Sequence, residues 1–83
     1  MCSYVTQRTA VTGSAKGSGG WFVLSHATVY VDHPYFTALD HTVNIDFIDE
    51  AAGPSARVAA ELSPASARAL IACIEAALDR AGM

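Results

Sequence analysis

Histidine and aspartate residues gather in one short window of the sequence. His26, His33 and His41 lie within sixteen residues, and the last two directly follow Asp32 and Asp40. Imidazole nitrogens suit copper, zinc, iron and nickel, and a neighbouring carboxylate can bind the ion or orient the ring. The pattern predicts a transition-metal site with the three histidines as ligands and the two aspartates in support.

Cys2 is a further candidate ligand because it follows Met1 directly. Removal of the initiator methionine requires a small second residue and would leave an α-amine beside the thiol, two groups that together can chelate an ion. The plainer interpretation is a small residue at the start of a strand. Cys2 and Cys73 are too few for a disulfide framework, and Cys73 is expected to be an inert thiol within a helix.

The spacing of these residues matches no strong metal signature such as CxxC pairs or HExxH, so two alternatives stay open. In the first, the protein is a non-enzymatic homo-oligomeric interaction module whose histidines are hydrogen-bonded at an interface or a loop base. In the second, it is a metal-free isomerase or cyclase. His26 would then be the general base in a partly apolar strand environment, with Tyr30 orienting the substrate.

A glycine-rich segment at residues 13–20 invites comparison with phosphate-binding loops. It lacks the GxxxxGK[ST] order and leads into a predicted strand, so no helix N-terminus is present to hold a phosphate. The composition predicts a flexible loop in which Lys16 is a candidate flap residue over an anion.

Four strands and one helix must position these residues. Alternating, β-branched-rich segments predict strands over 3–12, 21–32, 41–49 and 56–62. If the second and third strands form a hairpin, His33 and His41 lie near each other at its base. His26 lies about 23 Å from His33 along the strand. Ser63-Pro64 predicts a helix start, and apolar spacings of three and four continue to about residue 81.

This order of elements predicts a single α+β domain. We expect a four-stranded antiparallel β-meander followed by one C-terminal helix packed on one sheet face. One helix cannot cover both faces, and the second would carry Phe22, Leu24, Tyr30 and Ile48. The expected solution is a homodimer or higher homo-oligomer with sheets packed face to face or edge to edge.

Composition excludes several classes of function. The 83 residues contain 52% hydrophobic and 16% charged residues, and the net charge is -3. Only five residues are lysine or arginine, which argues against nucleic acid as a ligand. No apolar run reaches the roughly 18 residues of a membrane span. No signal peptide is recognisable, so a cytoplasmic protein is expected.

The chain resembles a family of small uncharacterised actinobacterial proteins of about 80–100 residues. The resemblance rests on segments 1–4, 11–17, 19–22, 26–30, 32–34, 40–42, 44–47, 53–58 and 66–70. It implies a complete protein and carries no activity. From the residues themselves, we expect a small metal- or small-molecule-binding protein. The Cys/His/Asp cluster extends this expectation to a metalloenzyme of specialised or accessory metabolism.

Overall fold

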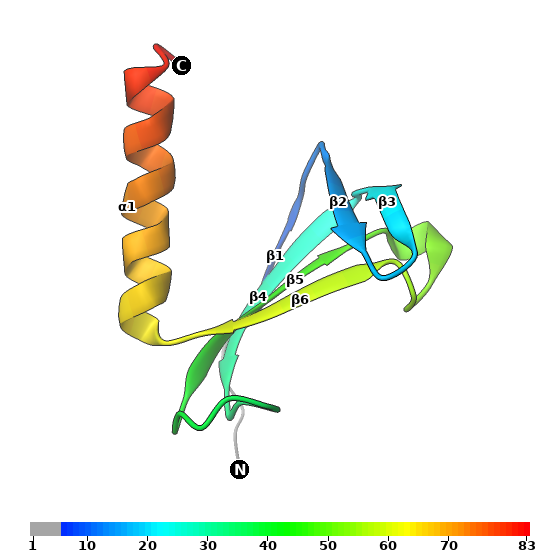
Figure 1. Cartoon of the computed structure of the whole chain (residues 1–83), viewed down its shortest axis with the longest axis horizontal. Coiled ribbons are helices and arrows are strands. Elements are labelled where there is room, and N and C mark those ends of the chain that lie inside the picture. Colours follow the sequence, from blue (N-terminus) through cyan, green and yellow to red (C-terminus); the bar gives the residue numbers. More distant parts are fainter. Residues whose placement is uncertain (1–5) are drawn as a thin grey trace.

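The computed structural model describes residues 6–83 and has the α+β architecture expected from the sequence (Figure 1). The strands are β1 (Thr6–Ala10), β2 (Ser14–Gly17), β3 (Gly20–Val23), β4 (His26–Asp32), β5 (Thr42–Ile48) and β6 (Arg57–Leu62). A short 3-10 helix, η1 (Glu50–Ala52), precedes β6, and the helix α1 (Pro64–Arg80) follows it.

β1, β4, β5 and β6 form one antiparallel sheet in that order. This arrangement agrees with the four predicted strands and with the hairpin between the second and third of them. It is not a simple meander, because β2 and β3 pair with each other in a separate two-stranded sheet. That small sheet is inserted between β1 and β4 in the sequence.

Strand register gives the four-stranded sheet a polar face and an apolar face. On the polar face Tyr30 opposes Asn44, which in turn opposes Glu61. Since side chains alternate along a strand, the neighbouring positions share the other face. We define the apolar face as Ala27, Val29, Val31, Val43, Ile45, Phe47, Val58, Ala60 and Leu62.

The predictions of a loop at 13–20 and of one continuous strand at 21–32 are wrong. Residues 14–17 pair with residues 20–23 across a tight turn, where Gly20 has a φ of 109° that favours glycine. The chain then bends, because the Leu24 N–H bonds the Gly13 carbonyl at 2.9 Å and the Ser25 N–H bonds the Ile48 carbonyl at 2.8 Å. Trp21 is therefore 70% exposed and does not face a core.

The helix begins as the sequence predicts but does not lie on the sheet. Ser63 is extended and its hydroxyl accepts the Ser66 N–H at 3.0 Å, with Pro64 in the first turn. Beyond its start, α1 diverges from the sheet (Figure 1). Only Ser63 joins β6 to α1, whereas such connections usually have about 2–6 residues. No loop turns the helix back onto the apolar face, so the expected packing is absent.

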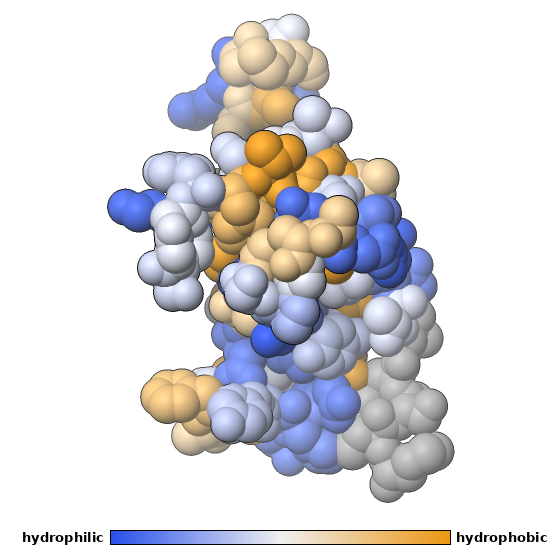
Figure 2. Space-filling model, turned by 90° about the vertical axis from the view of Figure 1, so that its right-hand side faces the viewer, coloured by the Kyte–Doolittle hydropathy of each residue, from blue (hydrophilic) through white to orange (hydrophobic). Residues whose placement is uncertain are grey.

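Few side chains of residues 6–83 are buried. The buried hydrophobic residues there are Ala27 and Ala56, and the buried polar residues are Thr42 and Asn44. Apolar side chains instead reach the surface, and Figure 2 shows them gathered in the upper half of one side of the molecule. Within the described residues, no helix has the length and apolar content needed to cross a membrane.

Candidate metal site

The base of the β4–β5 hairpin brings together His33, Asp40 and His41. β4 ends at Asp32 and β5 begins at Thr42, and these two residues are cross-strand partners. The pair closes the loop of residues 33–41, so its first and last residues are neighbours in space. The Asp32 carboxylate also accepts the His33 N–H at 2.7 Å, which fixes the start of the loop.

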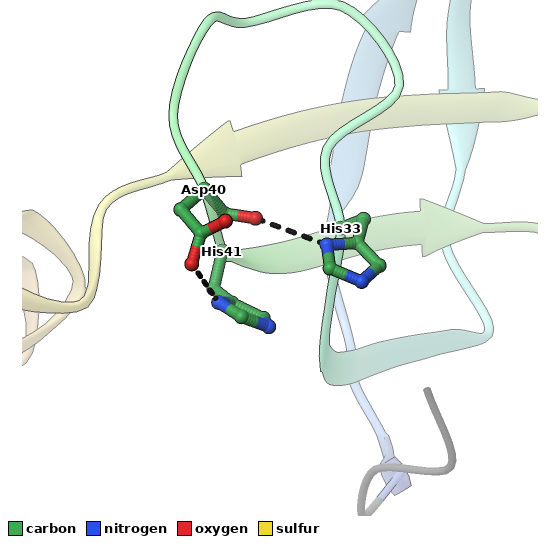
Figure 3. Close-up of side chains that lie close together, drawn as sticks. All are labelled: His33, Asp40 and His41. Carbon is green, nitrogen blue, oxygen red and sulfur yellow. Dashed lines mark hydrogen bonds and ion pairs between the residues drawn. The ribbon is translucent and has the colours of Figure 1, made fainter. Parts of the chain in front are cut away.

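Asp40 contacts both imidazole rings (Figure 3). His33 Nδ1 lies 3.1 Å from the Asp40 backbone oxygen, and His41 Nδ1 lies 2.8 Å from the Asp40 Oδ2. The two ring centroids are 4.7 Å apart, with an angle of 30° between the planes. One candidate ligand atom from each of the three residues lies within 4.8 Å of the others.

These contacts define which ring nitrogens would bind an ion. A carbonyl or carboxylate oxygen only accepts hydrogen bonds, so Nδ1 of each ring is the donor to Asp40. In neutral imidazole this places the lone pair on Nε2. Metal-binding histidines commonly donate their other N–H to a carbonyl or carboxylate in this way. In Figure 3 both rings extend to the side away from Asp40.

The three candidate ligand atoms, within 4.8 Å of one another, are more widely spaced than the donors around a bound ion. Zinc–nitrogen bonds of about 2.0–2.1 Å place tetrahedral donors roughly 3.4 Å apart. His33 and Asp40 are exposed and His41 is half-buried, so rotations of surface side chains can close the remaining gap. The exposure also gives an ion access from solvent and leaves coordination positions open to water or a small molecule.

Glu61 of β6 anchors the loop that carries the cluster. Its carboxylate accepts three consecutive backbone N–H groups, from Tyr35, from Phe36 at 3.1 Å and from Thr37 at 3.0 Å. These bonds, with that of Thr37 the largest, lower the pKa of Glu61 below its ordinary value. The anchor joins the middle of the 33–41 loop to the polar face of the sheet.

The strand beside the cluster is also fixed. Thr42 is fully buried, and its hydroxyl donates to the Asn44 Oδ1 at 2.7 Å. A satisfied buried pair of this kind holds the start of β5 in one conformation. His41 is the preceding residue, so its backbone is set by this pair.

His26 lies apart from the cluster. It occupies the first position of β4, pairs with Ile48, and has its Nδ1 2.9 Å from the Ser25 Oγ. The strand length between it and His33 is about 23 Å, so one ion cannot bind both within one chain. Near His26, an ion pair of 2.7 Å with Arg8 lowers the pKa of Glu50.

Tyr30 and Lys16 are also distant from the three clustered residues. Tyr30 lines an open cavity of about 650 Å³ on the polar face, together with the aromatic side chains of Tyr35 and Phe36. His26 does not line this cavity, so the structure does not unite the predicted base with Tyr30. Lys16 is exposed on β2, opposite Trp21, at the other end of the molecule (Figure 1). Cys2 lies outside the described residues.

Sequence reasoning missed Glu61 as part of the site. A glutamate on a short strand carries no sign that it binds a loop more than twenty residues earlier in the chain. The available signal for such an anchor is the loop itself. Tyr35 and Phe36, which follow His33-Pro34, are exposed, and the backbone N–H groups of this loop need acceptors. That signal identifies neither the acceptor nor its strand.

The fold and this cluster define a small α+β protein with two histidines and an aspartate at a hairpin base. The chain belongs to a family of unknown function, DUF6295, whose model matches residues 1–83. Neither a curated protein nor a solved structure gives a significant match.

Proposed function

We propose that the protein binds a divalent transition-metal ion through Nε2 of His33 and of His41, with Asp40 as the residue that orients both rings. The observation that carries the proposal is the double contact of Asp40, which directs the Nδ1 atom of both rings toward itself. Two imidazoles suit zinc, copper, nickel and iron better than magnesium or calcium. The net charge of -3 also favours cation binding.

The proposed role is binding of the ion together with a small ligand. Two imidazole donors leave coordination positions for water or a small molecule, and catalytic metal sites keep open positions of this kind. Cys2 stays a candidate for an additional ligand. A metalloenzyme activity would rest on the same open position.

Metal content tests the proposal. The protein is purified without an affinity tag, its metals are measured by mass spectrometry, and Zn²⁺ and Cu²⁺ are titrated in competition with a chromogenic chelator. We expect about one ion per chain. His33→Ala and His41→Ala should each weaken binding by more than the roughly 10–100-fold that loss of a supporting contact costs.

His26→Ala is the matched control, because it removes a histidine that lies outside the cluster. It should bind as the wild type does, and circular dichroism should show that all three variants are folded. Folded wild-type protein that takes up neither ion contradicts the proposal. Equal loss of binding in the His26 variant would show that the site is elsewhere.

A further inference from the structure

The apolar stripe of α1 has no partner within the described chain. Residues with spacings of three and four fall on one side of the helix, and they are 43–59% exposed: Leu70, Ile71, Ile74 and Leu78. The charged residues Glu75, Arg68 and Asp79 follow one flank of this stripe by the same spacing, with Glu75 nearest to it and Asp79 farthest from it. A stripe of this kind normally packs against another element.

The apolar face of the four-stranded sheet is covered only in part. Ala27 is buried, but Phe47 in the same row is 37% exposed, and Val29 and Ile45 in the central row are only partly buried. The 33–41 loop bonds to Glu61 and so lies on the polar face. In Figure 1 the helix rises on the side of the sheet opposite to that loop. The helix stripe and the apolar sheet face therefore border the same open space.

The exposed area of one chain is larger than that of a compact monomer of the same mass. The chain exposes 6137 Å², whereas a compact monomer of 8.7 kDa exposes about 4,700 Å². Its radius of gyration is 13.9 Å, compared with about 11.8 Å for a compact domain of this length. The excess of about 1,400 Å² exceeds the roughly 800 Å² per partner of a standard interface.

We propose that a second copy of this chain covers both surfaces by reciprocal exchange of helices. The α1 stripe of each copy lies on the apolar sheet face of the other. In a twofold dimer both chains present the same surfaces, so two complementary surfaces must lie on one chain. The α1 stripe and the apolar sheet face meet this condition. The helix, at 17 residues, is about 25 Å long, which matches the roughly 23 Å of β4 and β5.

The connection between β6 and α1 supports exchange over closure within one chain. Ser63 alone joins the two elements, its backbone is extended, and Pro64 follows it. Pro64 also restricts Ser63 to extended conformations. The helix is thereby directed away from its own sheet. This arrangement differs from the face-to-face or edge-to-edge dimer that the sequence suggests, because the helix is the exchanged element.

The exchange can be tested by mixing two variants, each of which is damaged on one of the two surfaces. Leu70→Glu with Ile74→Glu damages the helix stripe, and Phe47→Glu damages the sheet face. Each variant alone has both helix–sheet contacts damaged, so its dimer dissociation constant should rise at least about 100-fold. A mixed dimer of the two keeps one intact contact, formed by the helix of the sheet variant and the sheet of the helix variant.

The readouts are mass by light scattering and helix content by circular dichroism. We expect a wild-type dimer, monomeric or unfolded single variants, and a mixture that regains dimer mass and helix signal. Asp79→Asn, on α1 away from the apolar stripe, is the control and should remain a dimer. A wild-type monomer overturns the proposal, whether its helix closes on its own sheet or binds another protein. A mixture without recovery overturns the exchange, and favours helix–helix or face-to-face contact instead.

Discussion

At the residue scale, Asp40 determines how the two candidate ligands are oriented. Its backbone oxygen accepts from His33 and its carboxylate from His41. These two acceptors belong to one residue but respond differently to substitution, since only the carboxylate depends on the side chain. The contribution of the carboxylate can therefore be measured while the contact to His33 is kept.

Asp40→Asn should weaken metal binding by about 10–100-fold, the usual cost of losing a contact that orients a ligand. The reason is loss of the charged acceptor for the His41 Nδ1. The measurement is a Zn²⁺ dissociation constant from chelator competition. Asp79→Asn on the charged side of α1 is the control and should change nothing. An unchanged constant for the Asp40 variant would show that its carboxylate neither binds the ion nor orients His41.

The sequence predicts that His33 and His41 lie close together, but it does not predict the contacts of Asp40 and Glu61. The proximity of the two histidines follows from a hairpin whose strands are evident in the pattern. The separation of His26 also follows from counting residues along a strand. The role of the Asp40 backbone oxygen and the anchor at Glu61 depend on loop conformation and on which strand lies beside it, and neither is encoded in local spacing.

At the element scale, the 33–41 loop depends on the carboxylate of Glu61. The pKa of Glu61 is lowered in the folded protein, so its contribution is complete above the ordinary value of 4.5 and is lost as the pH falls through the lowered value. The amide NMR signals of Tyr35, Phe36 and Thr37 should therefore shift with a midpoint below 4.5. A midpoint at or above that value would contradict the anchor.

Glu61→Gln should remove this titration and loosen the loop at neutral pH. The amide side chain keeps one acceptor oxygen but loses the charge that strengthens all three backbone hydrogen bonds. Faster hydrogen exchange at Tyr35 to Thr37 is the expected result. Glu75→Gln serves as the control. If the loop exchanges at the wild-type rate in the Glu61 variant, other contacts hold it in place.

The elements themselves were predictable where local rules decide them. The cap at Ser63 and the bounds of α1, β5 and β6 agree with the sequence to within one residue. The direction of α1 was not predictable, because it is set by the one-residue connection and by what covers its stripe. The β2–β3 hairpin was missed because the four glycines and two serines of residues 13–20 are typical of loops.

At the scale of the whole molecule, few of residues 6–83 are buried, so the proposed dimer should contribute to stability. If folding and dimer formation are coupled, mass action raises the melting temperature with protein concentration. We expect a clear rise over a 100-fold range of concentration, measured by circular dichroism or calorimetry. The helix variant Leu70→Glu with Ile74→Glu should lose this dependence. A melting temperature that is the same at all concentrations in the wild type would indicate a monomer that is stable alone.

The most direct test of the metal site is X-ray absorption spectroscopy of the zinc-loaded wild-type protein. The proposed site predicts nitrogen and oxygen donors at about 2.0–2.1 Å, with the scattering pattern of two imidazole rings that is lost in the variant with both His33→Ala and His41→Ala. A sulfur donor at about 2.3 Å would add Cys2 to the ligands. A spectrum with oxygen donors and no imidazole would contradict the account.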